Sequence, residues 1–176
     1  RKIVEKVMDG MTNSWGTDFD AHGETFVINT VIGHLWHAVH GSHVERMYGT
    51  DLEPHVYDLV PQVADHVHWD TGEKWSDIRF GVSDKTSAAG GGHAHIGLMI
   101  YQGTNWPAAY RGGLFTLNLH GRRINHDLLA AKGAGYTATH GADMAFIDDP
   151  FYRGMDLVQG PDGGVYIADW SDTGEC

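Results

Sequence analysis

The chain has 176 residues, 41% of them apolar, so it is long enough to bury a hydrophobic core as one domain. Its formal net charge of −11, with 12 Lys and Arg residues, excludes the basic surface that nucleic-acid binding requires. A single Cys at position 176 excludes an internal disulfide, and the 24 Gly residues favour a turn-rich β protein.

The first predicted element is a hairpin over residues 15–28. Its turn is Asp20-Ala21-His22-Gly23, in which Gly23 can adopt a positive φ. His34 and His37 follow the second strand and therefore lie near a strand end, where β-propellers place the loops of their central channel. An imidazole with a pKa of about 6.5 suits proton abstraction, so either histidine is a candidate general base. The alternative is that this segment only packs Trp36.

Residues from about 40 to 92 form a predicted insertion with neither strand alternation nor a helical period. Its aromatic residues, among them Tyr48 and Trp69, and the triplet Gly90-Gly91-Gly92 favour an ordered loop over one face of the sheets rather than a linker. Long ordered loops tend to carry function.

Thirteen His residues are the compositional anomaly of the chain. The pairs His66/His68 and His93/His95 have an i, i+2 spacing, which in an extended chain places both imidazoles on one side. Two neutral ring nitrogens could then bind one metal ion, with a third ligand from Asp65, Asp70 or another His. The alternative is that these side chains are half-buried and bind loop backbones, since no HExxH motif accompanies them.

Further strands are predicted over residues 97–101 and 113–118, and another begins at residues 121–124. Residues 154–169 repeat the hairpin pattern around the turn Gly160-Pro161-Asp162-Gly163. Gly113 and Gly163 lie fifty positions apart, close to the period of about 40–50 residues in propeller blades. We therefore predict an all-β fold in which residues 1–176 are a fragment of one β-propeller domain, with about three blades.

The segment 97–115, followed by Gly121-Arg122-Arg123-Ile124, resembles the glucose/sorbosone dehydrogenase propeller family, and residues 153–163 resemble its last-blade motif. Residues 33–37, 92–95 and 169–176 are similar to the "membrane-bound dehydrogenase" propeller of large bacterial exported proteins, which carry a c-type haem CxxCH domain. The resemblance implies a six-bladed type of propeller, a periplasmic, extracellular or membrane-associated location, and oxidation of a sugar or alcohol with electrons passed to a cytochrome domain.

The resemblance also implies a pyrroloquinoline quinone (PQQ) cofactor with calcium, and assigns cofactor binding to Asn13, Arg153 and Asp169. Thr12 stands where the quinoprotein members carry an Arg before the Asn, and Met155 stands at the place of a second last-blade Arg. Without these two Arg side chains, fewer charged hydrogen bonds can be made to the carboxylates of PQQ.

Two classes of function therefore stay open: a quinoprotein-like dehydrogenase, and a non-catalytic module that binds a glycan or a protein partner. A metal site at His66, His68, His93 and His95 is a third hypothesis.

Overall fold

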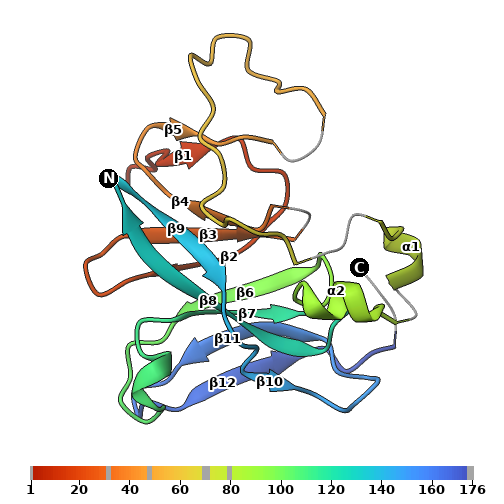
Figure 1. Ribbon diagram of the computed structural model, residues 1–176. Coiled ribbons are helices and arrows are strands. Elements are labelled where there is room, and N and C mark those ends of the chain that lie inside the picture. The colour runs from red at the N-terminus through yellow and green to blue at the C-terminus, as the bar shows by residue number, and fades with distance from the viewer. Residues whose placement is uncertain (1, 31–32, 47–48, 69–71, 79–80, 174–176) are drawn as a thin grey trace.

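The computed structural model describes residues 2–30, 33–46, 49–68, 72–78 and 81–173, without the side chain of Trp75. Tyr48, Trp69, Asp70 and Cys176 lie outside the described residues. Small antiparallel sheets follow one another along the chain, from the red and orange strands to the blue ones in Figure 1. No helix in the described ranges has the length and apolar character needed to cross a membrane.

The first sheet contains the predicted N-terminal hairpin. Strands β2 (Ser14–Phe19) and β3 (Thr25–Asn29) pair in antiparallel register, and Gly23 closes the turn through an N–H donated to the Asp20 carbonyl at 3.0 Å. A third strand that the sequence reading missed, β4 (Leu35–His37), pairs with β3. Two short parallel strands, β1 (Met8–Asp9) and β5 (Ser42–His43), form a separate pair.

The middle sheet is the largest. Its order is β10 (Ala145–Phe146), β8 (Arg123–Lys132), β7 (Leu114–Asn118) and β6 (His95–Ile100), and the 3₁₀ turn η1 (Ala108–Tyr110) lies in the β6–β7 connection. Strand β9 (Gly135–His140) pairs with the outer half of β8.

The last sheet is the predicted C-terminal hairpin, β11 (Gly154–Gln159) and β12 (Val165–Asp169). Gly163, with φ 77°, donates its N–H to the Gly160 carbonyl, which confirms the predicted turn.

The insertion is largely irregular, as predicted, but it contains two short helices, α1 (Trp75–Ile78) and α2 (Asp84–Ala88). An isolated bridge joins Ala64 to Ala138 of β9, which fixes the middle of the insertion to the middle sheet. In Figure 1 the insertion arches above the sheets and returns beside them through the yellow-green helices.

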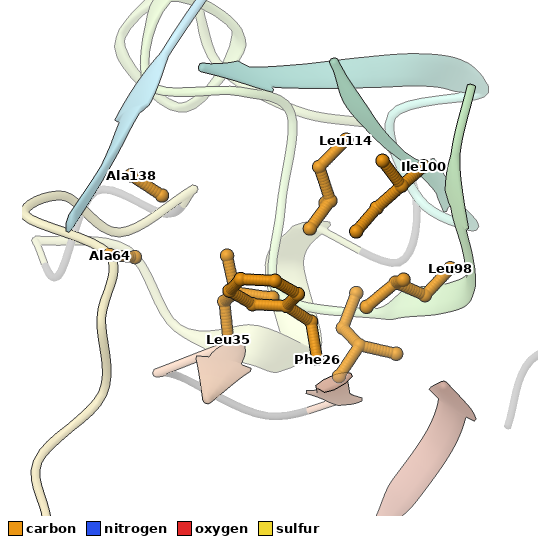
Figure 2. Close-up of a cluster of buried hydrophobic side chains, with 8 residues drawn as sticks. Phe26, Leu35, Ala64, Leu98, Ile100, Leu114 and Ala138 are labelled. Carbon is orange, nitrogen blue, oxygen red and sulfur yellow. The ribbon is translucent and has the colours of Figure 1, made fainter. Parts of the chain in front are cut away.

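Successive side chains of β6 point to opposite faces of the sheet, and both faces are buried. Leu98 and Ile100 point to the first sheet, where Phe26 and Leu35 meet them in the cluster of Figure 2, and Ala64 of the insertion joins that cluster. The opposite face of β6 packs against β11 in a second cluster that contains Met99, Tyr101, Phe115 and Leu157. The sheets are therefore joined face to face by side chains.

Candidate metal centre

A buried carboxylate lies at the centre of the histidine-rich region. Asp127 is in β8, between Leu114 of β7 and His140 of β9, and is 1% exposed. His34, also 1% exposed, immediately precedes β4, and its Nε2 lies 2.9 Å from Asp127 Oδ2. Its backbone N–H donates to Gln62 Oε1 at 3.0 Å, so the insertion fixes this loop.

His66 and His68 reach the same carboxylate from the insertion. The Asp65 N–H donates to the Ala138 carbonyl at 2.9 Å, which attaches this segment to β9. The Nε2 atoms of His66 and His68 each lie 3.3 Å from Asp127 Oδ1 and 2.7 Å from each other. Two ring nitrogens this close share one proton or bind one cation.

The glycine triplet of the insertion makes room for His68. Gly90 has a φ of +121°, and a Cβ on it would lie 2.4 Å from His68 Nδ1. The Gly90 carbonyl accepts hydrogen bonds from Asn118 and Asn125, at 3.2 and 2.8 Å. The Gly92 N–H donates to the His68 carbonyl at 2.7 Å. Glycine is therefore required here so that the backbone can pass beside an imidazole.

Two more histidines border the cluster. His95, the first residue of β6, is 2% exposed, and its ring centroid lies 4.8 Å from that of His34 and 4.4 Å from that of His68. No described residue offers a hydrogen bond to either of its ring nitrogens. His140 ends β9, with its Nδ1 3.9 Å from Asp127 Oδ1 and its ring 4.7 Å from that of His68.

Burial sets the protonation states of this cluster. Burial raises the pKa of Asp127, but the surrounding imidazoles of His140, His34, His66 and His68 outweigh burial and hold that pKa well below its usual value. Burial lowers the pKa of His68 to about 3 and lowers that of His95 well below its ordinary value. Both imidazoles are therefore neutral at pH 7 and keep a lone pair for a metal ion.

His66 differs from its neighbours. Burial lowers its pKa, yet the hydrogen bonds and charges of Asp127 and Asp65 raise it above the ordinary value. Asp127 and Asp65 therefore favour a proton on His66.

Carboxylates also lie near the ring nitrogens of His66 and His140 that point away from Asp127. Asp65 Oδ1 lies 3.0 Å from His66 Nδ1, and Asp143 Oδ1 lies 3.7 Å from His140 Nε2. Arg123 and Asn125 donate to Asp143 at 2.8 and 2.7 Å. The contact of Asp65 with His66 is the usual support of a metal-binding imidazole, whereas the Asp143–His140 distance is longer than a hydrogen bond.

These residues fit a metal ion. One ligand atom from each of His34, His66, His68 and Asp127 lies within 4.8 Å of the others. An ion about 2.0–2.2 Å from each of four ligands holds them about 3.3–3.6 Å apart, so side-chain movements of about 1 Å would bring this set onto one ion. Three imidazoles and one carboxylate suit zinc and the neighbouring first-row transition metals, rather than the all-oxygen shells of calcium and magnesium.

The structure brings together only some of the predicted site residues. His66, His68, His95 and His34 meet in the cluster, whereas His93 does not. The His95 N–H donates to the His93 carbonyl at 3.2 Å, so the chain is turned rather than extended at this pair. The His93 ring instead contacts that of His120, at 4.9 Å between centroids.

His37 also lies away from the cluster. It is three positions after His34 across the start of β4, so its side chain is on the opposite face. Its Nε2 lies 2.7 Å from Glu24 Oε2, and its ring stacks on that of Phe26.

The predicted cofactor residues occupy two separate places. The Asn13 amide donates to the Thr30 hydroxyl beside the first sheet. Arg153, which immediately precedes β11, and Asp169, which ends β12, lie together: the Arg153 backbone N–H donates to Asp169 Oδ1 at 2.7 Å. The Arg153 guanidinium donates to the carbonyls of Pro150 and Tyr152, at 3.1 and 2.7 Å, and lines a hollow of about 590 Å³ whose described lining does not include Asn13.

Sequence reasoning missed Asp127 and His140. Both lie in strands that it did not predict in full, since it started a strand at residues 121–124 without following it to Lys132. The available signal was the Asn-His-Asp run at residues 125–127 between two apolar stretches, because a charged residue inside a buried strand needs a partner.

Solved glucose dehydrogenases share this fold. A putative oxidoreductase (glucose dehydrogenase) of Thermus thermophilus superposes with a TM-score of 0.57 at 16% identity, over 92% of this chain and 40% of that one. A second glucose dehydrogenase gives 0.55 at 18% identity, over 95% of this chain and 44% of that one. The chain thus spans about two fifths of these structures and is part of a β-propeller, as predicted.

A comparison with curated protein sequences finds no match. The family model described as "Domain of unknown function (DUF7133)" matches residues 2–173. Because this match covers nearly the whole sequence, the chain belongs to the DUF7133 family.

Proposed function

We propose that this chain is a metal-binding propeller segment that holds a transition-metal ion at His34, His66, His68 and Asp127. One observation carries the proposal: three imidazoles, one from the loop before β4 and two from the insertion, converge on one buried carboxylate of β8.

The buried charges support a cation at this place. Asp127 is ionised and buried, while His68 and His95 are neutral. The nearby guanidinium of Arg123 pairs with Asp143 instead, at 2.8 Å. A metal ion at Asp127 replaces the proton that Asp127 and Asp65 favour on His66, and its binding free energy stabilises the folded chain.

Solvent reaches the cluster from one side. The side chains of His66 and His140 are 17% and 22% exposed, whereas those of His34 and Asp127 are 1% exposed. An ion can therefore enter beside His66 and His140, and a position on that side is open to water or substrate. A bound ion could polarise such a ligand as a Lewis acid or transfer electrons, according to the metal.

The test is metal analysis of protein purified without a His tag and then equilibrated with Zn²⁺ or Co²⁺. We expect tight binding, and a loss of affinity in His66→Ala of at least the roughly 10–100-fold that removal of an outer partner costs. His22→Ala, in the exposed hairpin turn, is the matched control and should bind as wild type. Failure of the wild-type protein to retain either ion would refute the proposal.

A second candidate function is oxidation of a sugar or alcohol. The fold shared with glucose dehydrogenases favours it. PQQ with Ca²⁺, bound through Asn13, Arg153 and Asp169, is the proposed cofactor of this candidate, and the metal centre is the alternative source of oxidation. Dye-linked oxidation of aldoses is assayed with PQQ and Ca²⁺ and, separately, with the metal-loaded protein. The two assays distinguish oxidation by PQQ from oxidation at the metal centre. Absence of activity in both assays would refute this candidate.

An electron-accepting haem c domain and an extracytoplasmic location go with this second candidate. The non-catalytic alternative is a glycan- or protein-binding module that uses the insertion. A glycan screen on the intact protein and on a variant without residues 44–90 tests it, because only the intact protein should then bind.

A further inference from the structure

The cluster contains more donors than one ion needs. A single ion takes about four ligands, and His34, His66, His68 and Asp127 supply them. His95 and His140 then remain in ring contact with His68. We propose that the centre binds two transition-metal ions bridged by the carboxylate of Asp127, an inference that rests on the proposed metal-binding function.

The two oxygens of Asp127 face different partners. Oδ1 faces His66 and His68 at 3.3 Å and His140 at 3.9 Å. Oδ2 faces His34 at 2.9 Å. A carboxylate with imidazoles on both oxygens has the geometry of a bridging ligand.

The first ion belongs to the Oδ1 side. His66, His68 and His140 would bind it together with Oδ1. The 3.9 Å between His140 Nδ1 and Oδ1 exceeds a hydrogen bond but matches two ligands of one ion. Asp65 supports the outward nitrogen of His66 at 3.0 Å, and Asp143 lies 3.7 Å from the outward nitrogen of His140, beyond a direct hydrogen bond.

The second ion belongs to the Oδ2 side, with His34 and His95. His95 provides the independent observation, because it is 2% exposed and no described residue bonds either of its ring nitrogens. A buried imidazole without partners loses its hydrogen bonds to water and gains none in return. A metal ion on its lone pair removes that cost. Its ring centroid lies 4.8 Å from that of His34, the imidazole that pairs with Asp127 Oδ2.

Three carboxylates lie within or beside the two proposed ion positions. Asp127 lies between them, and Asp65 and Asp143 stand behind the ligands of the first ion. Ions in two-metal centres lie about 3.5–4 Å apart and together hold a water or substrate oxygen between them. The side exposed at His66 and His140 is where such a ligand would enter.

The experiment measures the number of ions bound. Protein without a His tag is saturated with Zn²⁺, separated from free Zn²⁺ by gel filtration, and analysed for metal and protein. We expect two Zn²⁺ per wild-type chain and one in His95→Phe, which keeps the ring but removes both nitrogens. His37→Phe is the matched control, because His37 is a buried imidazole outside the cluster, and it should retain two. Far-UV circular dichroism checks folding of each variant.

A second readout uses Cu²⁺. Two Cu²⁺ ions bridged by one carboxylate couple magnetically, so the wild-type EPR signal should be weaker than its copper content predicts, and His95→Phe should show the full signal of one ion. If His95→Phe fails to fold, His140→Phe replaces it and should lose the first ion.

The outcomes separate the two proposals. No Zn²⁺ in the wild-type protein refutes the metal-binding function itself. One Zn²⁺ in the wild-type protein, unchanged in His95→Phe, overturns only the two-ion centre.

Discussion

Gly90 lies against His68 so closely that one methyl group is expected to displace the imidazole. A Cβ at this position would lie 2.4 Å from His68 Nδ1, and ordinary contact begins at 3.4 Å, so the ring would have to move by about 1 Å. The rings of His34, His95 and His140 surround the other sides of His68. The ring therefore has no free space to enter.

The expected cost of Gly90→Ala has two parts. A φ of +121° costs an alanine about 1–3 kcal/mol, and overpacking adds about 1–3 kcal/mol. We expect the free energy of unfolding to fall by about 2–6 kcal/mol, and Zn²⁺ affinity to fall because His68 no longer faces Asp127.

Urea unfolding with and without Zn²⁺ measures both effects. Gly133→Ala is the matched control, since Gly133 has a φ of +61° but nothing within 4 Å of its Cβ position. It should lose only about 1–2 kcal/mol of stability and no metal affinity. Equal stability loss in both variants, with unchanged Zn²⁺ affinity in Gly90→Ala, would refute the reasoning.

Three further predictions concern stability and pH. Tyr101→Phe should cost about 2–4 kcal/mol in urea unfolding, since the buried hydroxyl accepts from two backbone N–H groups and donates to the Gly163 carbonyl; a loss below about 1 kcal/mol would contradict this. A hydrogen bond to Asp51 raises the pKa of His43 above 6.5, so the stabilisation is complete below that pH and is lost as pH rises through the raised pKa. An NMR titration should therefore give a His43 midpoint above 6.5, and His43→Gln should remove that part of the pH dependence. Zn²⁺ at 100 times its Kd should stabilise the protein by about 2.7 kcal/mol, seen as a rise in Tm that EDTA reverses; an unchanged Tm would argue against binding to the folded state.

Local patterns were enough to predict the hairpins and the propeller blades. The turns at Gly23 and Gly163 have a conformation that glycine alone adopts readily, and the flanking apolar residues specify strands. The strands β4 and β9 were missed although each pairs with its neighbour in sequence, β4 with β3 and β9 with β8 across the turn at Gly133. Only the bridge between Ala64 and Ala138, which attaches the insertion to β9, is a long-range contact without a local sequence signal.

Local sequence patterns also predicted only part of the candidate site. The i, i+2 spacing correctly placed His66 beside His68, since that rule depends only on local geometry. It did not hold for His93 and His95, where a backbone hydrogen bond turns the chain. Asp127 belongs to the cluster only because β8 carries it next to the insertion, and that is a property of the fold rather than of the local sequence.

The most direct test of the metal centre is a crystal structure of the Zn²⁺-loaded protein with an anomalous difference map at the zinc edge. We expect anomalous density about 2.0–2.2 Å from ring nitrogens of His66 and His68 and from the carboxylate of Asp127. Anomalous density only at exposed histidines such as His22 and His55, with none at Asp127, would contradict the metal centre.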